Sequence, residues 1–147
     1  MPSSNGCSAE DEITISINPL PVVELGNDTA ICQNESILLD AGNTGADFSW
    51  SNGETTQTIS VDAADTYSVT VTDANGCSAE DEITISINPL PVVELGNDTA
   101  ICQNESILLD AGNTGADFSW SNGETTQTIS VDADDTYSVT VTDANGC

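Results

Sequence analysis

Residues 7–74 read CSAEDEITISINPLPVVELGNDTAICQNESILLDAGNTGADFSWSNGETTQTISVDAADTYSVTVTDA, and the chain then starts the same sequence again. Residues 5–74 align with residues 75–144 without a gap and differ only at Ala64 and Asp134, so the repeating unit is 70 residues long. A long period in which every strand and turn signal recurs is typical of a tandem array of small domains. The 147-residue chain is therefore expected to form two domains.

The charged residues all have one sign. The chain contains 25 Asp and Glu and no Lys, Arg or His, so its formal net charge is −25 and no side-chain salt bridge can form. Such a chain cannot neutralise phosphates, which argues against nucleic acid and anionic membrane surfaces as partners. No apolar run approaches the roughly 20 residues of a membrane span. Each carboxylate must face water, take up a proton or meet an external cation.

Short alternating segments between turn residues predict an all-β fold. Residues 12–17 and 66–72 alternate apolar and polar side chains, which places every second residue on one buried face. Further strands are expected at residues 21–25, 36–40, 48–50, 56–61 and 82–87. About seven short strands at this spacing predict a β-sandwich in each unit. The expected fold is thus a row of tandem immunoglobulin-like sandwiches of about 70 residues, stacked end to end.

Two aromatic residues favour the immunoglobulin-like version. Trp50 lies on the third expected strand, where such sandwiches bury a tryptophan, and Asp65-Thr-Tyr67 resembles a tyrosine corner. Both rings are expected in the core. The alternative is a carbohydrate-binding module, in which Trp50, Tyr67 or Phe48 would stack on a sugar and would have to lie at the surface.

Prolines mark the boundary between the units. Residues 19–21 cannot continue a strand ladder, so we expect a stiff linker there, a first domain at residues 19–88 and a second at 89–147. The second domain lacks a closing strand, and residues 1–18 carry that strand's sequence. Residues 1–18 then either complete a neighbouring molecule by donor-strand pairing, giving a head-to-tail homopolymer, or belong to a preceding repeat of a longer covalent array. Both alternatives give a filament.

Five cysteines occupy two positions of the repeat. Cys7, Cys77 and Cys147 share one position, and Cys32 and Cys102 share the other. Small acidic repeats with this cysteine content fit an oxidising extracellular setting. We expect one disulfide in each domain, and these are Cys32–Cys77 and Cys102–Cys147. Each would close a loop of about 45 residues and contribute roughly 4 kcal/mol in the chain-entropy model. Cys7 would pair with a preceding repeat or another chain; free buried thiols are the alternative.

Three motifs in this order carry a resemblance to a known family. They are PLPVVELGNDTAIC at residues 19–32, WSNGETTQTI at 50–59 and TYSVTVTDANGC at 66–77. The chain resembles the tandem immunoglobulin-like or PKD-like repeats of secreted Bacteroidota surface proteins, and is most similar to acidic tandem-repeat fibres held by calcium. The resemblance covers essentially the whole chain. It implies an extracellular structural module of a filament, surface stalk or adhesin, with a cysteine pair stapling each domain.

Oxygen-bearing side chains gather in the expected turns at both ends of each sandwich. Calcium takes six to eight such oxygen ligands. An ion between stacked domains would cancel charge where repulsion is greatest and would stiffen the linker. The predicted ligands are Asp28, Asp62, Asp65, Asp73, Asn75, Asp110, Asp117, Asp132, Asp135, Asp143 and Asn145. The alternative is that these turn residues are solvated and bind no ion.

Catalysis finds little support in the sequence. Neither His nor Lys is present to act as a base near neutral pH, and paired cysteines are not nucleophiles, so no enzyme activity is expected. Asp28-Thr-Ala30 fits the O-glycosylation pattern of Bacteroidota, and Asn27-Asp-Thr29 fits the N-glycosylation sequon. Thr29 and its counterpart Thr99 are therefore the candidate positions for glycosylation.

Overall fold

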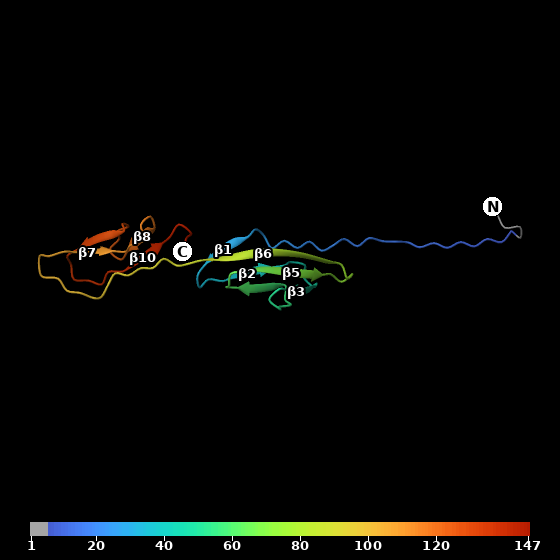
Figure 1. Ribbon diagram of the computed structural model, residues 1–147, viewed down its shortest axis with the longest axis horizontal. Helices are drawn as coiled ribbons and strands as arrows, with labels where there is room; N and C mark the ends of the chain where they lie inside the picture. The colour runs from blue at the N-terminus through green and yellow to red at the C-terminus, as the bar shows by residue number, and fades with distance from the viewer. Residues whose placement is uncertain (1–5) are drawn as a thin grey trace.

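The structure is a computed structural model that describes residues 6–147. Within this range the chain is all-β, with ten strands and no helix. Figure 1 shows two lobes lying end to end, with the N-terminal part of the chain extending away from the first lobe. The first lobe contains β1 to β6 and the second lobe contains β7 to β10. Residues 1–5 of the predicted segment 1–18 lie outside the described residues.

A four-stranded sheet and a facing pair of strands form the first lobe. The sheet has the order β1-β6-β5-β3, in which β1 is parallel to β6 and the other neighbours are antiparallel. The facing strands, β2 and β4, are antiparallel to each other. The bounds are Thr29–Cys32 for β1, Ile37–Asp40 for β2, Asp47–Trp50 for β3, Thr58–Val61 for β4, Asp65–Thr72 for β5 and Ser78–Asn88 for β6.

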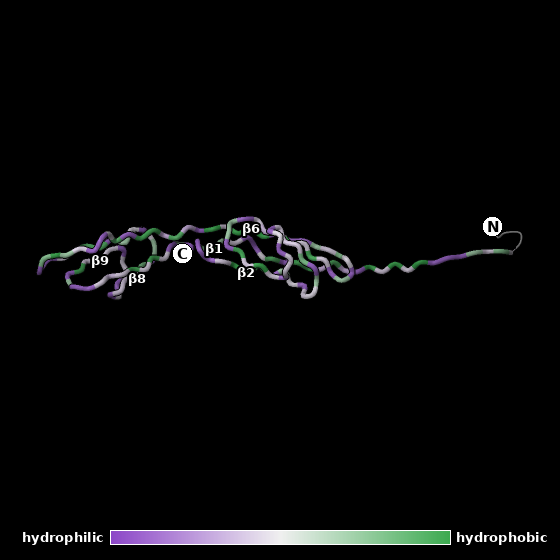
Figure 2. The backbone as a smooth tube through the Cα atoms, turned by 90° about the horizontal axis from the view of Figure 1, so that it is seen from below, coloured by the Kyte–Doolittle hydropathy of each residue, from purple (hydrophilic) through white to green (hydrophobic). Residues whose placement is uncertain are grey.

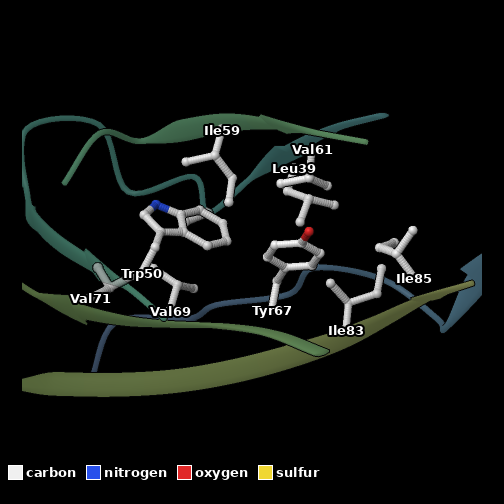
Figure 3. Packing of buried hydrophobic residues seen from close by; sticks show 10 residues of the cluster. Leu39, Trp50, Ile59, Val61, Tyr67, Val69, Val71, Ile83 and Ile85 are labelled. Carbon is white, nitrogen blue, oxygen red and sulfur yellow. The ribbon is translucent and has the colours of Figure 1, made fainter. Parts of the chain in front are cut away.

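Side chains from both layers of the first lobe meet in one core. Figure 3 shows apolar side chains of β2 and β4 packed over Trp50 and Tyr67 from the sheet. Trp50 Nε1 donates a hydrogen bond to the Thr56 carbonyl at 2.6 Å, and Tyr67 Oη donates one to the Ala63 carbonyl at 2.9 Å. The Tyr67 bond reaches four residues upstream, as in a tyrosine corner. The predicted burial of both rings is confirmed.

The second lobe repeats only part of this arrangement. β7 pairs with β9 and β8 pairs with β10, both antiparallel. β10 contains four residues, whereas its counterpart β5 contains eight. No strand in the described part of the second lobe occupies the positions of β1 and β6. The bounds are Ile107–Asp110 for β7, Asp117–Trp120 for β8, Thr128–Val131 for β9 and Val139–Thr142 for β10.

The strand expected at residues 21–25 does not form. Side chains take backbone groups that a strand ladder would use: the Leu25 N–H donates to Asp81 Oδ2 at 2.9 Å, and Asn43 Nδ2 donates to the Val22 carbonyl at 2.7 Å. β1 begins at Thr29, four residues beyond the expected strand. β1 forms because β6 pairs with it in parallel. A local sequence pattern cannot predict a pairing with so distant a strand.

Candidate assembly interface

Strand β6 completes the first lobe. It lies between β1 and β5, and its register places Ile85 opposite Thr29 on one side and Asp65 on the other. Ile83 and Ile85 are 3% and 1% exposed, and Figure 3 shows Ile83 next to Tyr67 in the core. Full burial of an isoleucine side chain contributes roughly 1.5–3 kcal/mol. The first lobe therefore depends strongly on this strand.

The second lobe has an open groove where β6 lies in the first lobe. The groove has a volume of about 600 Å³. Its lining includes Leu95, Asp98, Ile101, Asp135 and Tyr137, which are the counterparts of residues that surround β6 in the first lobe. Because the repeats have nearly one sequence, the groove shows what a second β6 would cover.

Two apolar side chains of the second lobe are more exposed than their counterparts in the first. Val93 and Ile101 are 36% and 38% exposed, whereas the equivalent residues, Val23 and Ile31, are partly buried against the first core. Residues 99–102 form no strand, although the equivalent residues form β1 in the first lobe. The uncovered side chains and the missing strand have one cause, since β6 supplies both the cover and the pairing partner in the first lobe.

The N-terminal segment, which we define as residues 8–18, carries the sequence of β6. Both read SAEDEITISIN. The segment is extended, belongs to no sheet, and leaves Ile13, Ile15 and Ile17 82%, 71% and 86% exposed. Figure 2 shows hydrophobic residues spaced along it, and most of its length lies clear of both lobes. The half-buried strand expected at residues 12–17 is thus not formed within one molecule, because β6 already fills the matching place in the first lobe.

Three hydrogen bonds outside the strand ladder of β5 also hold β6 in place. They are Thr84 N–H to Asp28 Oδ1 at 2.9 Å, Leu25 N–H to Asp81 Oδ2 at 2.9 Å, and Gln33 N–H to the Asn88 carbonyl at 2.8 Å. The counterparts of these donors and acceptors are divided between the groove and the N-terminal segment. The groove has Asp98, Leu95 and Gln103, and the segment has Thr14, Asp11 and Asn18. Each donor in one therefore has a matching acceptor in the other.

The disulfide in the structure differs from the predicted pairs. Cys32 bonds to Cys147, with Cα atoms 5.6 Å apart, and Cys77 and Cys102 are free thiols. Cys32 lies opposite Asn88 at the end of β6, whereas Cys77 precedes the start of that strand. An 11-residue strand spans roughly 36 Å, far beyond the reach of a disulfide, so the prediction of one pair within each domain is wrong. The disulfide joins the two lobes instead.

The predicted calcium ligands do not converge. Among residues 6–147, no group of three or more His, Cys, Asp or Glu side chains is placed to hold a metal ion. Asp73 Oδ1 accepts the N–H groups of Asn75 and Cys77 at 2.9 and 3.0 Å, and so closes the turn before β6. Asp143 makes the equivalent bonds to Asn145 and Cys147. These carboxylates are engaged in local turn structure.

Of the remaining predicted ligands, Asp132 and Asp135 line the groove together, and the others are dispersed. Asp28 binds the backbone of β6, as described above. Asp110 Oδ1 accepts the Gly112 N–H at 2.8 Å and the Gln127 side-chain amide at 3.1 Å, and these two bonds lower the pKa of Asp110. The other predicted ligands are exposed, and they are Asp62, Asp65, Asp117, Asp132 and Asp135. The chain presents no assembled cation site within its described residues, and calcium stays a prediction.

Several other predicted sites lie at the surface. Thr29 is exposed in β1 and Thr99 is exposed at the groove, and their glycosylation stays a prediction. Cys7 is exposed in the extended N-terminal part. Trp50 and Trp120, by contrast, are each 3% exposed, so neither indole offers a face on which a sugar could stack.

Comparisons with known proteins leave the site to be interpreted from its geometry. No protein-family model matches the chain, and the curated proteins contain no significant match to it. None of the described residues belongs to a helix that is long and apolar enough to cross a membrane. The likeness to Bacteroidota repeats remains a resemblance.

Proposed function

We propose that this chain is the structural subunit of an extracellular filament or surface stalk, in which the N-terminal segment of one molecule fills the groove of another. One observation carries the proposal: the segment and β6 have the same sequence, and the place that β6 fills in the first lobe is open in the second. In strand addition of this kind, main-chain hydrogen bonds give affinity and the pockets for alternate side chains give register.

The position of the segment favours a linear polymer. Figure 1 shows it at the end of the molecule opposite the second lobe, so a molecule cannot fill its own groove in this arrangement. Each molecule then has one donor and one acceptor. A head-to-tail contact of this type does not close on itself and extends into a filament. A further repeat in the same chain would supply the same strand covalently, and the joint would be the same.

The register of the joint follows from the first lobe. In β6, Ile83 lies opposite Tyr67 and Ile85 lies opposite Asp65. One repeat away, Ile13 of the donor molecule would lie opposite Tyr137 of the acceptor, and Ile15 opposite Asp135. The two isoleucines would then move from solvent into the second core. At roughly 1.5–3 kcal/mol for each buried side chain, this burial is a substantial driving force for assembly.

The remaining features of the proposal agree with the sequence. We propose that each lobe is an immunoglobulin-like sandwich, that the setting is oxidising and extracellular, and that the chain is a structural protein and not an enzyme. Calcium between stacked lobes would add to this joint but is not required by it. An adhesin or carbohydrate-binding module, the other candidate, is less well supported because the tryptophans that would contact a sugar are buried.

A matched pair of substitutions in the full chain tests the joint. Ile15→Asp places a charge where the joint needs an apolar side chain, and we expect it to leave monomers in light scattering and electron microscopy. Ser16→Asp adds the same charge on the other face of the segment. Its counterpart in β6, Ser86, is exposed, so this variant should assemble like the unmodified chain.

Peptide binding provides the positive side of the same test. A synthetic peptide of residues 8–18 should bind the Ile15→Asp variant with one-to-one stoichiometry by calorimetry, because that variant keeps an open groove. The same peptide carrying the Ile15→Asp change should not bind. Filaments of ordinary length from Ile15→Asp would overturn the proposal, since the segment could not then be the connector.

A further inference from the structure

The disulfide between the lobes lies at the end of β6, where the first lobe meets the second. Cys32 ends β1 and lies opposite Asn88, the last residue of β6, and Cys147 bonds to it from the second lobe. The strand β6 thus runs through the first lobe and ends at the junction between the two lobes. At this junction, Cys32 of the first lobe bonds to Cys147 of the second.

The N-terminal segment ends at an equivalent place. Its last residue, Asn18, is the counterpart of Asn88. Cys77 is the counterpart of Cys147, and its Sγ atom lies 4.0 Å from the Asn18 carbonyl oxygen. Half of a second junction is therefore present in the molecule: the end of the strand and the cysteine of the lobe that follows it. The other half would be a cysteine of the lobe that this strand completes.

In the proposed filament that cysteine is Cys102 of the acceptor molecule. The register that pairs Cys32 with Asn88 pairs Cys102 of the acceptor with Asn18 of the donor when the N-terminal segment fills the groove. Cys102 then meets Cys77 of the donor beside Asn18. Both thiols are free in the single molecule, and they are left over because Cys32 and Cys147 have already paired.

We infer that successive molecules are joined by a disulfide between Cys102 of the acceptor and Cys77 of the donor, formed after strand exchange. The inference rests on the proposed function, because without strand exchange the two cysteines lie in separate molecules with nothing to bring them together. In the reaction the two thiols lose two electrons and two protons. A low-molecular-weight disulfide such as glutathione disulfide takes them up and leaves as two thiols.

The consequence is one covalent connection at every joint. Each molecule would contribute Cys32–Cys147 within itself and one Cys102–Cys77 bond to its neighbour, so the filament would be cross-linked at every lobe junction along its length. Noncovalent strand exchange would set the order of the molecules, and oxidation would then fix it. Such a filament would survive denaturation of its lobes until a reductant is added.

Gel electrophoresis without reductant tests the inference. Filaments assembled with glutathione disulfide are treated with an alkylating agent, denatured in detergent and run without reductant. We expect a ladder of multiples of the 15.2 kDa chain, which collapses to monomers when reductant is present. Cys77→Ser and Cys102→Ser should each abolish the ladder but still give filaments in the electron microscope. Cys7→Ser is the control and should keep the ladder.

The possible outcomes separate the disulfide from the strand exchange. Unmodified filaments that run as monomers without reductant would overturn the disulfide and leave the strand exchange standing. A ladder that survives Cys102→Ser would also overturn it, since other cysteines would then form the link. If no filaments form with or without reductant, the proposed function fails and the inference fails with it. Substitutions are needed because residues 29–35 and 99–105 are identical, so peptides containing Cys32 and Cys102 cannot be told apart.

Discussion

The first and second lobes have nearly one sequence but differ in completeness. Where both repeats are present they differ only at Ala64 and Asp134, which are exposed in both lobes, and Asp134 lines the groove. The first lobe has a four-stranded sheet, whereas the second has two separate pairs of strands. What distinguishes them is β6, which the first lobe receives from the start of the next repeat.

The same comparison shows that strand formation here depends on the partner. Residues 65–68 belong to β5 because β6 pairs with them, and the identical residues 135–138 belong to no strand in the described structure. The N-terminal segment shows the same effect, since its sequence is an 11-residue strand in one place and an extended, exposed segment in the other. A unit of this kind is completed by a neighbour, whichever chain provides it.

A substitution that disrupts β6 should have the largest effect on the difference between the lobes. Ile85→Asp places an unpaired charge at a position that is 1% exposed, and we expect the first lobe to lose more than about 3 kcal/mol of stability and to open like the second. Ile15→Asp makes the same change in the same sequence at an exposed position. It should leave the stability of the monomer unchanged, because the Ile15 side chain is exposed and packs in no core.

Hydrogen exchange measured by mass spectrometry can follow each lobe separately. Peptides that span position 64 or 134 differ in mass, because Ala64 is replaced by Asp134 in the second repeat. In the unmodified monomer the peptide around position 134 should exchange faster than the one around position 64. Ile85→Asp should bring both to the faster rate. If the peptide around position 64 stays protected in that variant, β6 is not what closes the first lobe.

Loss of the Cys32–Cys147 disulfide should have the next largest effect on stability. Cys147→Ser removes a link between residues 115 apart in sequence, and we expect a loss of about 2–4 kcal/mol in denaturant unfolding under oxidising conditions. Cys77→Ser is the matched control, since Cys77 is a free thiol in the single molecule and its loss should not alter monomer stability. Equal loss in both variants would mean that the two cysteines exchange partners in solution.

Local patterns predicted the strands that a single repeat defines by itself. The alternation at residues 66–72 and the placement of Trp50 and Tyr67 indicated a buried strand and a core, and both are present. β1 and the cysteine pairing were not predicted correctly. Both depend on the length and register of β6, which brings Cys32 to the far end of the lobe, and pairing between distant strands leaves no periodic signal in the sequence.

Alkaline titration probes Tyr67, a residue of the first core whose counterpart, Tyr137, lines the groove. Burial raises the pKa of the Tyr67 phenol, and the negative charges of Asp65 and Asp62 raise it further. Because its pKa is higher in the folded than in the unfolded state, the neutral phenol contributes stability that is fully present below about pH 10 and is lost as pH rises through the folded pKa. Ultraviolet absorbance of the Tyr137→Phe variant should therefore show phenolate forming only above the pH at which free tyrosine titrates.

The matching variant removes this pH dependence. Tyr67→Phe lacks the hydrogen bond to the Ala63 carbonyl and should lose about 1 kcal/mol at neutral pH. It should also lack the alkaline step in stability that this residue causes. A Tyr67 that titrates at the ordinary tyrosine value in the Tyr137→Phe variant would show that the first core is more accessible to solvent than its packing indicates.

Calcium is expected to have the smallest effect on stability. Adding or removing it tests whether the ends of both lobes bind cations. With a net charge of −25 and no cationic side chain, any salt should raise the melting temperature by screening repulsion. A calcium ion held by ligands should stabilise the protein beyond screening at the same ionic strength, by about 0.4 kcal/mol when its concentration equals the dissociation constant. Melting and filament length are therefore compared in calcium, in magnesium and in EDTA at constant ionic strength. Identical values in calcium and EDTA would remove the ion from the proposal, and the strand joint would then have to overcome the repulsion between molecules by burying Ile13 and Ile15 alone.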